Sequence, residues 1–115
     1  MSSLESGEPS SSIRDRVEAA RAIQRERFRG ARVTCNAEMT TRQLRKHCEL
    51  SPPSRTLLTQ AIDRLGLSAR AHDRILKVSR TIADLASTER IESAHVAEAV
   101  QYRALDRAYF RGELS

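Results

Sequence analysis

The chain has 115 residues and a net charge of +5, which is enough for one small domain. It contains only two Phe, two Tyr and no Trp, so its core has to be built from Ala, Leu, Ile and Val, a composition that suits closely packed helices. No apolar run approaches the roughly 20 residues of a transmembrane helix, and the first residues lack the basic and apolar regions of an export signal. We therefore expect a cytoplasmic protein with no membrane contact.

Residues 1–11 are rich in Ser, Glu, Gly and Pro and predict a disordered tail. Residues 12–39 follow as a linker helix and connector. The helix is expected over about 13–29, with Ser11 or Ser12 as its cap and Gly30 as its end. Its apolar seam is thin, which indicates a helix that is half solvated or that docks on something else.

Residues 40–110 are expected to form a helical domain. Thr40 and Gln43 form the pattern of a capping box at the start of a short helix. The Pro52-Pro53 pair ends any preceding helix, and the next one is expected over 55–65, with Gly66 as its C-terminal stop.

The clearest periodicity lies in residues 69–86, where apolar side chains recur in steps of four and three. The expected core stripe is Ala71, Ile75, Val78, Ile82 and Leu85, widened by Leu76, Ser79 and Ala83. The opposite face is expected to be solvated and holds Asp73, Arg74, Lys77, Arg80, Thr81 and Asp84, with Asp73 and Lys77 spaced to pair.

After this helix, Ile91 is a lone apolar anchor in an extended step. A last helix then begins with Ser93 or Glu92 as its cap, and residues 111–115 form a second tail. The expected fold class is all-α, a compact array of four to five helices.

Arg70 stands at an unusual place in this pattern. Ser68 is a good N-cap, which puts Arg70 at the second helical position, where the helix dipole disfavours a cation. An arginine there makes sense if a phosphate or carboxylate arrives from outside. The alternative is that Arg70 points into water or pairs with a nearby acid. Arg74 and Lys77 follow on the same side over two turns.

Several kinds of chemistry have no motif in this sequence. Neither a GxxxxGK[ST] loop nor a hydrophobic run that ends in acids is present, and no spacing suggests a Ser-His-Asp or Cys-His arrangement. Cys35 and Cys48, with His47 and His72, lack the spacing of a metal site. We expect no metal ligands here, and we do not expect this chain to hydrolyse ATP alone.

Three segments carry a family resemblance. They are the Gly-Leu-Ser-x-Arg start at residues 66–70, the ILKVSRTIADL run at 75–85 and the Ala-x-Gln-Tyr-Arg close at 99–103, with an Asn-Ala-x-Met segment upstream at 36–39. Over about residues 8–110 the sequence resembles the C-terminal helical lid domain of the magnesium-chelatase-like AAA+ ATPases, in their competence-associated branch.

The resemblance implies a role for Arg70. In that family it would occupy the sensor 2 position, which reads the γ-phosphate of ATP, and Arg74 is the next candidate if the register differs by one turn. ATP and Mg²⁺ would be bound by a separate core domain that is absent from this chain. The resemblance also implies a hexameric ring that acts on DNA during competence and recombination. Whether Arg70 serves its own or a neighbouring subunit's nucleotide stays open.

Two other classes of function remain open from the residues alone. Residues 13–32 hold seven arginines and three acids, most of the excess charge, so Arg14, Arg21, Arg25 and Arg29 could contact nucleic acid in a stand-alone protein. Against this, no stacking aromatics lie among those arginines. The second class is a structural adaptor that docks through the first helix and binds no nucleotide.

Overall fold

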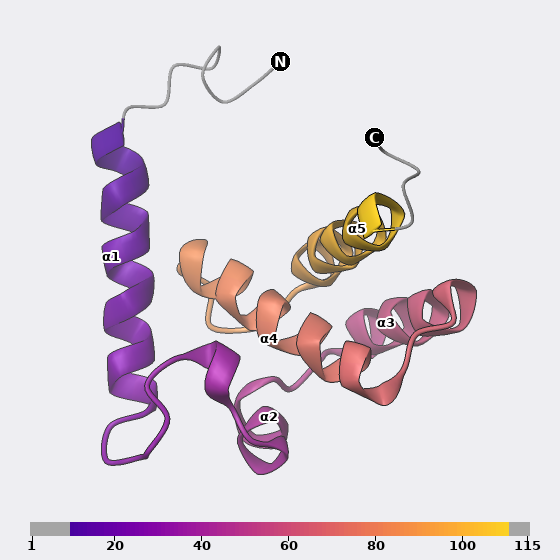
Figure 1. Ribbon diagram of the computed structural model, residues 1–115. Coiled ribbons are helices and arrows are strands. Elements are labelled where there is room, and N and C mark those ends of the chain that lie inside the picture. The colour runs from indigo at the N-terminus through magenta and orange to yellow at the C-terminus, as the bar shows by residue number, and fades with distance from the viewer. Residues whose placement is uncertain (1–9, 111–115) are drawn as a thin grey trace.

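The computed structural model describes residues 10–110, with side chains described as far as residue 103. In chain order the elements are α1 (Ser10–Arg27), the 3-10 turn η1 (Asn36–Glu38), α2 (Thr41–His47), α3 (Pro52–Leu65), α4 (Ala69–Leu85) and α5 (Ser93–Phe110) (Figure 1). The expected all-α fold class is confirmed. The expected tails fall largely outside this range, at residues 1–9 and 111–115. None of the described helices is long and apolar enough to cross a membrane.

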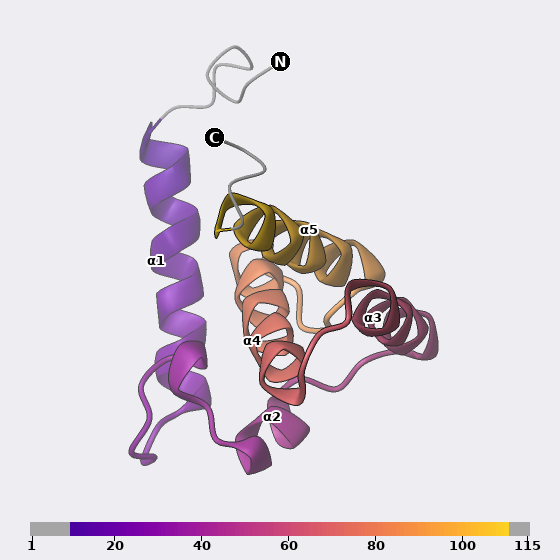
Figure 2. The same cartoon turned by 45° about the vertical axis from the view of Figure 1, so that its right-hand side comes forward.

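Helix α4 lies at the centre of the fold. It contacts α1, η1, α2 and α5, and α5 also packs on α3. Figures 1 and 2 show α1 on one side of α4 and the α3–α5 pair on the other, with α2 near the amino-terminal half of α4. The amino-terminal half of α1 extends beyond the rest of the helical array (Figure 1).

The helix caps largely follow the sequence. The capping box of α2 is confirmed, because Thr40 Oγ1 accepts from the Gln43 amide while the Gln43 side chain accepts from the Thr40 amide. Gly66 ends α3 in the left-handed conformation, with φ of 63°. The expected start of α3 near Arg55 was wrong. The helix begins at Pro52, capped by Ser51, because proline needs no N–H partner in the first turn.

The bounds of α1 also differ from those expected. The helix begins at Ser10, ahead of the expected caps, and ends at Arg27 instead of near residue 29. Phe28 follows at once, and its side chain is 4% exposed. Gly30, with φ of 78°, lies in the turn beyond the helix. The chain therefore leaves α1 where Phe28 enters the core.

The link between α4 and α5 turns the chain back onto α3. The backbone amide of Thr88 donates a hydrogen bond to the Ala83 carbonyl at 2.8 Å. This bond closes the C-terminal end of α4, where Ser87 adopts the left-handed conformation with φ of 54°. Ile91 is 1% exposed and forms an isolated parallel bridge with Leu50, which confirms the expected anchor. Glu92 is the cap of α5, since its carbonyl accepts from the amides of residues 95 and 96.

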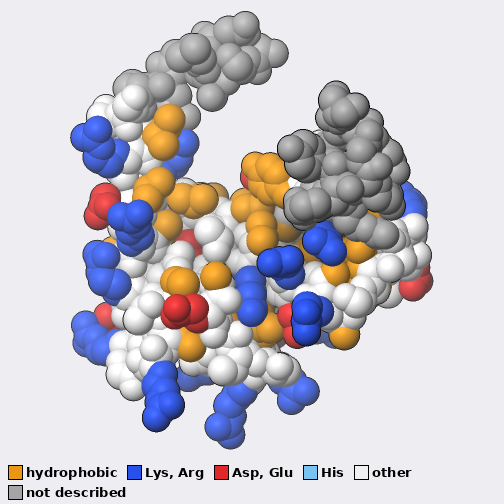
Figure 3. All heavy atoms as spheres, viewed as in Figure 1, with side chains coloured by type: hydrophobic (Ala, Val, Ile, Leu, Met, Phe, Trp, Pro, Cys, Tyr) orange, Lys and Arg blue, Asp and Glu red, His pale blue; other side chains and the backbone are white. Residues whose placement is uncertain are grey.

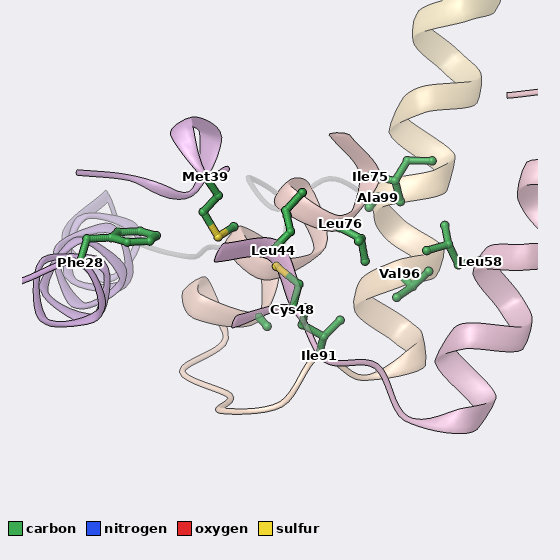
Figure 4. Packing of buried hydrophobic residues seen from close by; sticks show 11 residues of the cluster. Phe28, Met39, Leu44, Cys48, Leu58, Ile75, Leu76, Ile91, Val96 and Ala99 are labelled. Carbon is green, nitrogen blue, oxygen red and sulfur yellow. The ribbon is translucent and has the colours of Figure 1, made fainter. Parts of the chain in front are cut away.

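The hydrophobic core runs from the end of α1 to α3 and α5. Figure 4 shows Phe28 pointing toward Met39, and on the other side Leu58 of α3 close to Val96 of α5. On α4 the fully buried apolar side chains are Ala71, Ile75, Leu76 and Ala83. Val78, Ile82 and Leu85 are only half buried. The expected core stripe is therefore correct along one edge, while its other edge lies at the surface.

The unequal burial of this stripe gives a stability prediction. Ile75→Ala should cost about 2–5 kcal/mol of unfolding free energy, because Ile75 is 2% exposed and its truncation leaves a cavity. Ile82→Ala should cost clearly less, since Ile82 is half buried. Urea unfolding followed by circular dichroism measures both. Equal losses of unfolding free energy for the two variants would contradict the difference in burial between Ile75 and Ile82.

Candidate functional site

Arg70 lies at the start of α4, as the sequence predicts. Ser68 Oγ accepts from the Ala71 amide at 3.2 Å, so Ala69 and Arg70 are the first two helical residues. The Arg70 side chain is exposed, and among the described residues it forms no hydrogen bond or ion pair. A pair with a nearby acid is therefore excluded among the described residues, whereas a side chain that points into water and one that receives an external anion both fit this exposure.

A surface depression of about 660 Å³ brings three cations of α4 together. It is lined by Arg70, Arg74, Lys77, Asp73, Val78 and Ala37. The predicted alignment of the three cations along one side of the helix is therefore confirmed. Three positive groups and one acid leave the depression with an excess of positive charge, which suits a phosphate or carboxylate.

Asp73 takes a different partner from the one expected. Its Oδ1 lies 3.2 Å from Nδ1 of His72, and among the described residues no hydrogen bond or ion pair joins it to Lys77. Both side chains are more than 40% exposed, so this pair contributes little to stability. Lys77 is consequently left available on the wall of the depression.

The α1 arginines form a separate surface. Arg14, Arg21 and Arg25 recur at spacings of seven and four and share one helix face, and Figure 3 shows Lys and Arg side chains along the outer edge of α1. Arg21 pairs with Glu18 at 3.4 Å, and Arg29 pairs with Glu26 at 2.8 Å. Two of the four predicted nucleic-acid contacts thus already have acidic partners, and no α1 residue lines the depression on α4.

A buried ionic cluster was missed by the sequence analysis. Asp84 and Arg80, which were expected on the solvated face of α4, are 0% and 5% exposed. Arg27 binds both carboxylate oxygens of Asp84 at 2.8 Å, a bidentate pair that joins α1 to α4. Asn36 donates to the same carboxylate at 2.8 Å, and Arg80 Nε donates at 3.2 Å.

Arg80 extends this cluster into the loops. Its guanidinium donates to the carbonyls of Glu89 and Thr88, both at 2.9 Å, and to that of His47 at 3.3 Å. Burial lowers the pKa of Arg80, and the adjacent Asp84 carboxylate opposes that change. Arg80 therefore ties the end of α2 and the loop after α4 to one buried carboxylate.

Asn36 completes the cluster and explains the Asn-Ala-x-Met segment. The backbone amide of Asn36 donates a hydrogen bond to Oε1 of Gln24 at 3.0 Å. Its side-chain Nδ2 also donates to the Thr81 hydroxyl at 3.0 Å. Arg27 donates to its side-chain oxygen at 2.8 Å. The spacing of Arg80 and Asp84 could have suggested an i,i+4 pair, but nothing in the sequence connects Arg27 or Asn36 with residue 84.

The remaining titratable side chains near the core have structural roles. His47 lies edge-on to the Phe28 ring, with centroids 5.6 Å apart, and its pKa is lowered by burial and then by nearby Arg27, Lys46 and Arg80. Burial raises the pKa of the Cys48 thiol to about 11, so that thiol is protonated at neutral pH. Among the described residues no three potential metal ligands lie together.

Comparison with known proteins decides the family. The protein-family model described as "Magnesium chelatase, subunit ChlI C-terminal" matches residues 7–103 of this chain. The chain belongs to this family. The match includes Arg70, Arg74 and every member of the buried cluster.

Individual relatives agree with this assignment. The chain is 43% identical over 101 residues to competence protein ComM of Haemophilus influenzae, and 41% identical over 101 residues to YifB of Salmonella typhimurium and of Escherichia coli. Each of these matches covers 88% of this chain but only 19% of the relative. The chain thus spans about a fifth of the length of the relatives it matches and corresponds to the competence-associated branch of the family.

The buried cluster predicts a large effect of a single atom replacement. Asp84→Asn should destabilise the fold by about 3–5 kcal/mol, because it leaves two buried guanidinium groups without their counter-ion. Glu26→Gln removes an acid from an exposed pair and should change stability by less than about 0.5 kcal/mol. Urea unfolding measures both, and similar small losses for the two variants would contradict the structural role of Asp84.

His47 predicts a pH dependence of stability. Its folded pKa lies below the ordinary value of 6.5, so the folded state resists protonation. The free energy of unfolding should be highest above about pH 6.5 and should fall as the pH drops below that value through the lower, folded pKa. His47→Gln should reduce this fall between about pH 7.5 and 5, measured by urea unfolding. An unchanged fall in His47→Gln would rule out this cause.

Proposed function

We propose that this chain is the lid domain of an AAA+ ATPase and that Arg70 senses the terminal phosphate of ATP held by a core domain outside this chain. The observation that carries the proposal is the Arg70 guanidinium, which is exposed and has no partner among the described residues. It stands beside Arg74 and Lys77 in a depression that favours anions. Membership of the magnesium chelatase C-terminal family supports the assignment.

Arg70 would act through charge-assisted hydrogen bonds. Such bonds from a guanidinium to phosphate oxygens are roughly twice as strong as neutral ones, and they would be lost when the terminal phosphate leaves. The core domain would supply the ATP and the Mg²⁺. Arg74 and Lys77 would add positive charge along the same helix face, and Arg74 would take the sensing role if α4 docks one turn further along.

The proposal extends to the assembled protein. The core domain would lie in the same polypeptide or in a partner, in keeping with the small share of each relative that this chain spans. We propose a hexameric ring in which Arg70 serves either its own or a neighbouring subunit's nucleotide. We further propose that the assembled protein acts on DNA in competence; the name of the Haemophilus relative, competence protein ComM, supports the role in competence.

A chimera tests the sensing role. In it, this chain replaces the matched segment of competence protein ComM of Haemophilus influenzae. Arg70→Ala should lower ATP turnover of the chimera at least about tenfold, because a charge-assisted phosphate contact is removed. It should leave the unfolding free energy within about 0.5 kcal/mol, since Arg70 is exposed.

Arg64→Ala is the matched control for this experiment. Arg64 is also exposed and lies near the end of α3, outside the depression. Its substitution should leave turnover unchanged. Equal turnover for Arg70→Ala and Arg64→Ala would contradict the proposal and would favour a structural adaptor that reads no nucleotide. A loss in Arg74→Ala alone would move the sensing role by one turn.

A further inference from the structure

The uncovered edge of the α4 stripe forms an apolar groove. It has a volume of about 310 Å³, and its lining includes Val78, Ile82 and Leu85 of α4, Ala37 of η1 and Tyr102 of α5. The Tyr102 side chain is a large ring that is 56% exposed, and it donates only a 3.3 Å hydrogen bond to Glu98 on its own helix. Val78 and Ile82 pack partly against the core cluster. The rest of their apolar surface, together with that of the half-buried Leu85, lines the groove.

The groove continues into the depression that holds Arg70. Ala37, Lys77 and Val78 line both. One strip therefore runs along α4 from Arg70 to Leu85, a rise of about 22 Å. Its Arg70 end is cationic and its Leu85 end is apolar, and Figure 3 shows basic and hydrophobic side chains next to each other over α4. A partner that reaches Arg70 from outside lies against the start of this strip.

We infer that this strip is the docking surface for the nucleotide-binding domain of the same ATPase, with Tyr102 as its anchor. The inference rests on the proposed function, because the surface next to Arg70 on the same helix face has to lie against whatever carries the nucleotide. The relatives extend far beyond the matched segment, which supplies a protein domain as the occupant. Its complementary surface is acidic opposite Arg74 and Lys77 and apolar opposite Ile82, Leu85 and Tyr102.

Exposed aromatics of this kind are common anchors of interfaces. Tyrosine gives a large contact area for two side-chain torsions, and binding energy concentrates on such residues near the centre of an interface. The half-buried Val78, Ile82 and Leu85 surround Tyr102 with further apolar area. Arg74 and Lys77 would orient the approaching domain more than they would hold it.

Hydroxyl-radical footprinting tests the inference on the full-length chimera with ComM. The oxidation rates of Tyr102 and Leu85 should fall at least about fivefold in the chimera relative to this chain alone, because docking removes them from water. Within the described part of the chain, the other large exposed hydrophobic residue is Ile13, at 43% exposure; it lies outside the strip and should keep its rate. Equal rates for Tyr102 in the two proteins would overturn the inference.

Substitutions in the chimera sharpen the result. Tyr102→Ala should restore oxidation of Ile82 and Leu85, whereas Tyr102→Phe retains the ring and should preserve their protection. Arg70→Ala should also preserve it, since Arg70 contributes to sensing and not to the apolar contact. Protected Tyr102 together with normal turnover of Arg70→Ala would support docking while contradicting the proposed function. If Tyr102 is not protected in the chimera while Arg70→Ala lowers ATP turnover, the proposed function is supported and the docking inference is contradicted.

A second copy of this chain is the competing occupant. If the isolated chain protects Tyr102 as its concentration rises and the chimera adds nothing further, the strip is a self-association surface and the inference is wrong. If Tyr102 of the isolated chain stays unprotected at every concentration and Tyr102 of the chimera is protected, the nucleotide-binding domain is the occupant.

Discussion

The fold depends on a single buried carboxylate. Asp84 has no exposed surface and receives hydrogen bonds from Arg27, Arg80 and Asn36, which belong to three separate elements. Buried charges cost several kcal/mol each unless they are paired and hydrogen-bonded, and here both carboxylate oxygens are satisfied. Because the apolar seam of α1 is thin, this ionic cluster does much to hold the linker helix on the domain.

The cluster also gives α4 two different ends. Near its C-terminus, Arg80 and Asp84 are fixed to α1, η1 and the following loop. At its N-terminus, Arg70 is exposed and aligned with Arg74 and Lys77. A helix of 17 residues is about 25 Å long and rigid on this scale. In the proposed ATPase, a force applied to Arg70 by a phosphate would therefore act on α1 through the whole of α4.

Local patterns predicted the helices well. The Thr40 capping box, the Ser68 cap and the left-handed Gly66 depend on neighbouring residues and were visible in the sequence. The exposure of Arg70 followed from its place at the helix start. Periodicity failed at Arg80 and Asp84, because it assigns polar residues to solvent and cannot detect a partner 57 positions away. It likewise could not show that Val78, Ile82 and Leu85 are only half buried in the described part of the chain.

The most direct measurement is a structure of the full-length ComM chimera with a non-hydrolysable ATP analogue. The account predicts the Arg70 guanidinium at about 2.7–2.9 Å from an oxygen of the terminal phosphate, with the Arg27–Asp84 pair intact. A nucleotide whose terminal phosphate contacts no cation of α4, with Arg70 still facing solvent, would contradict it.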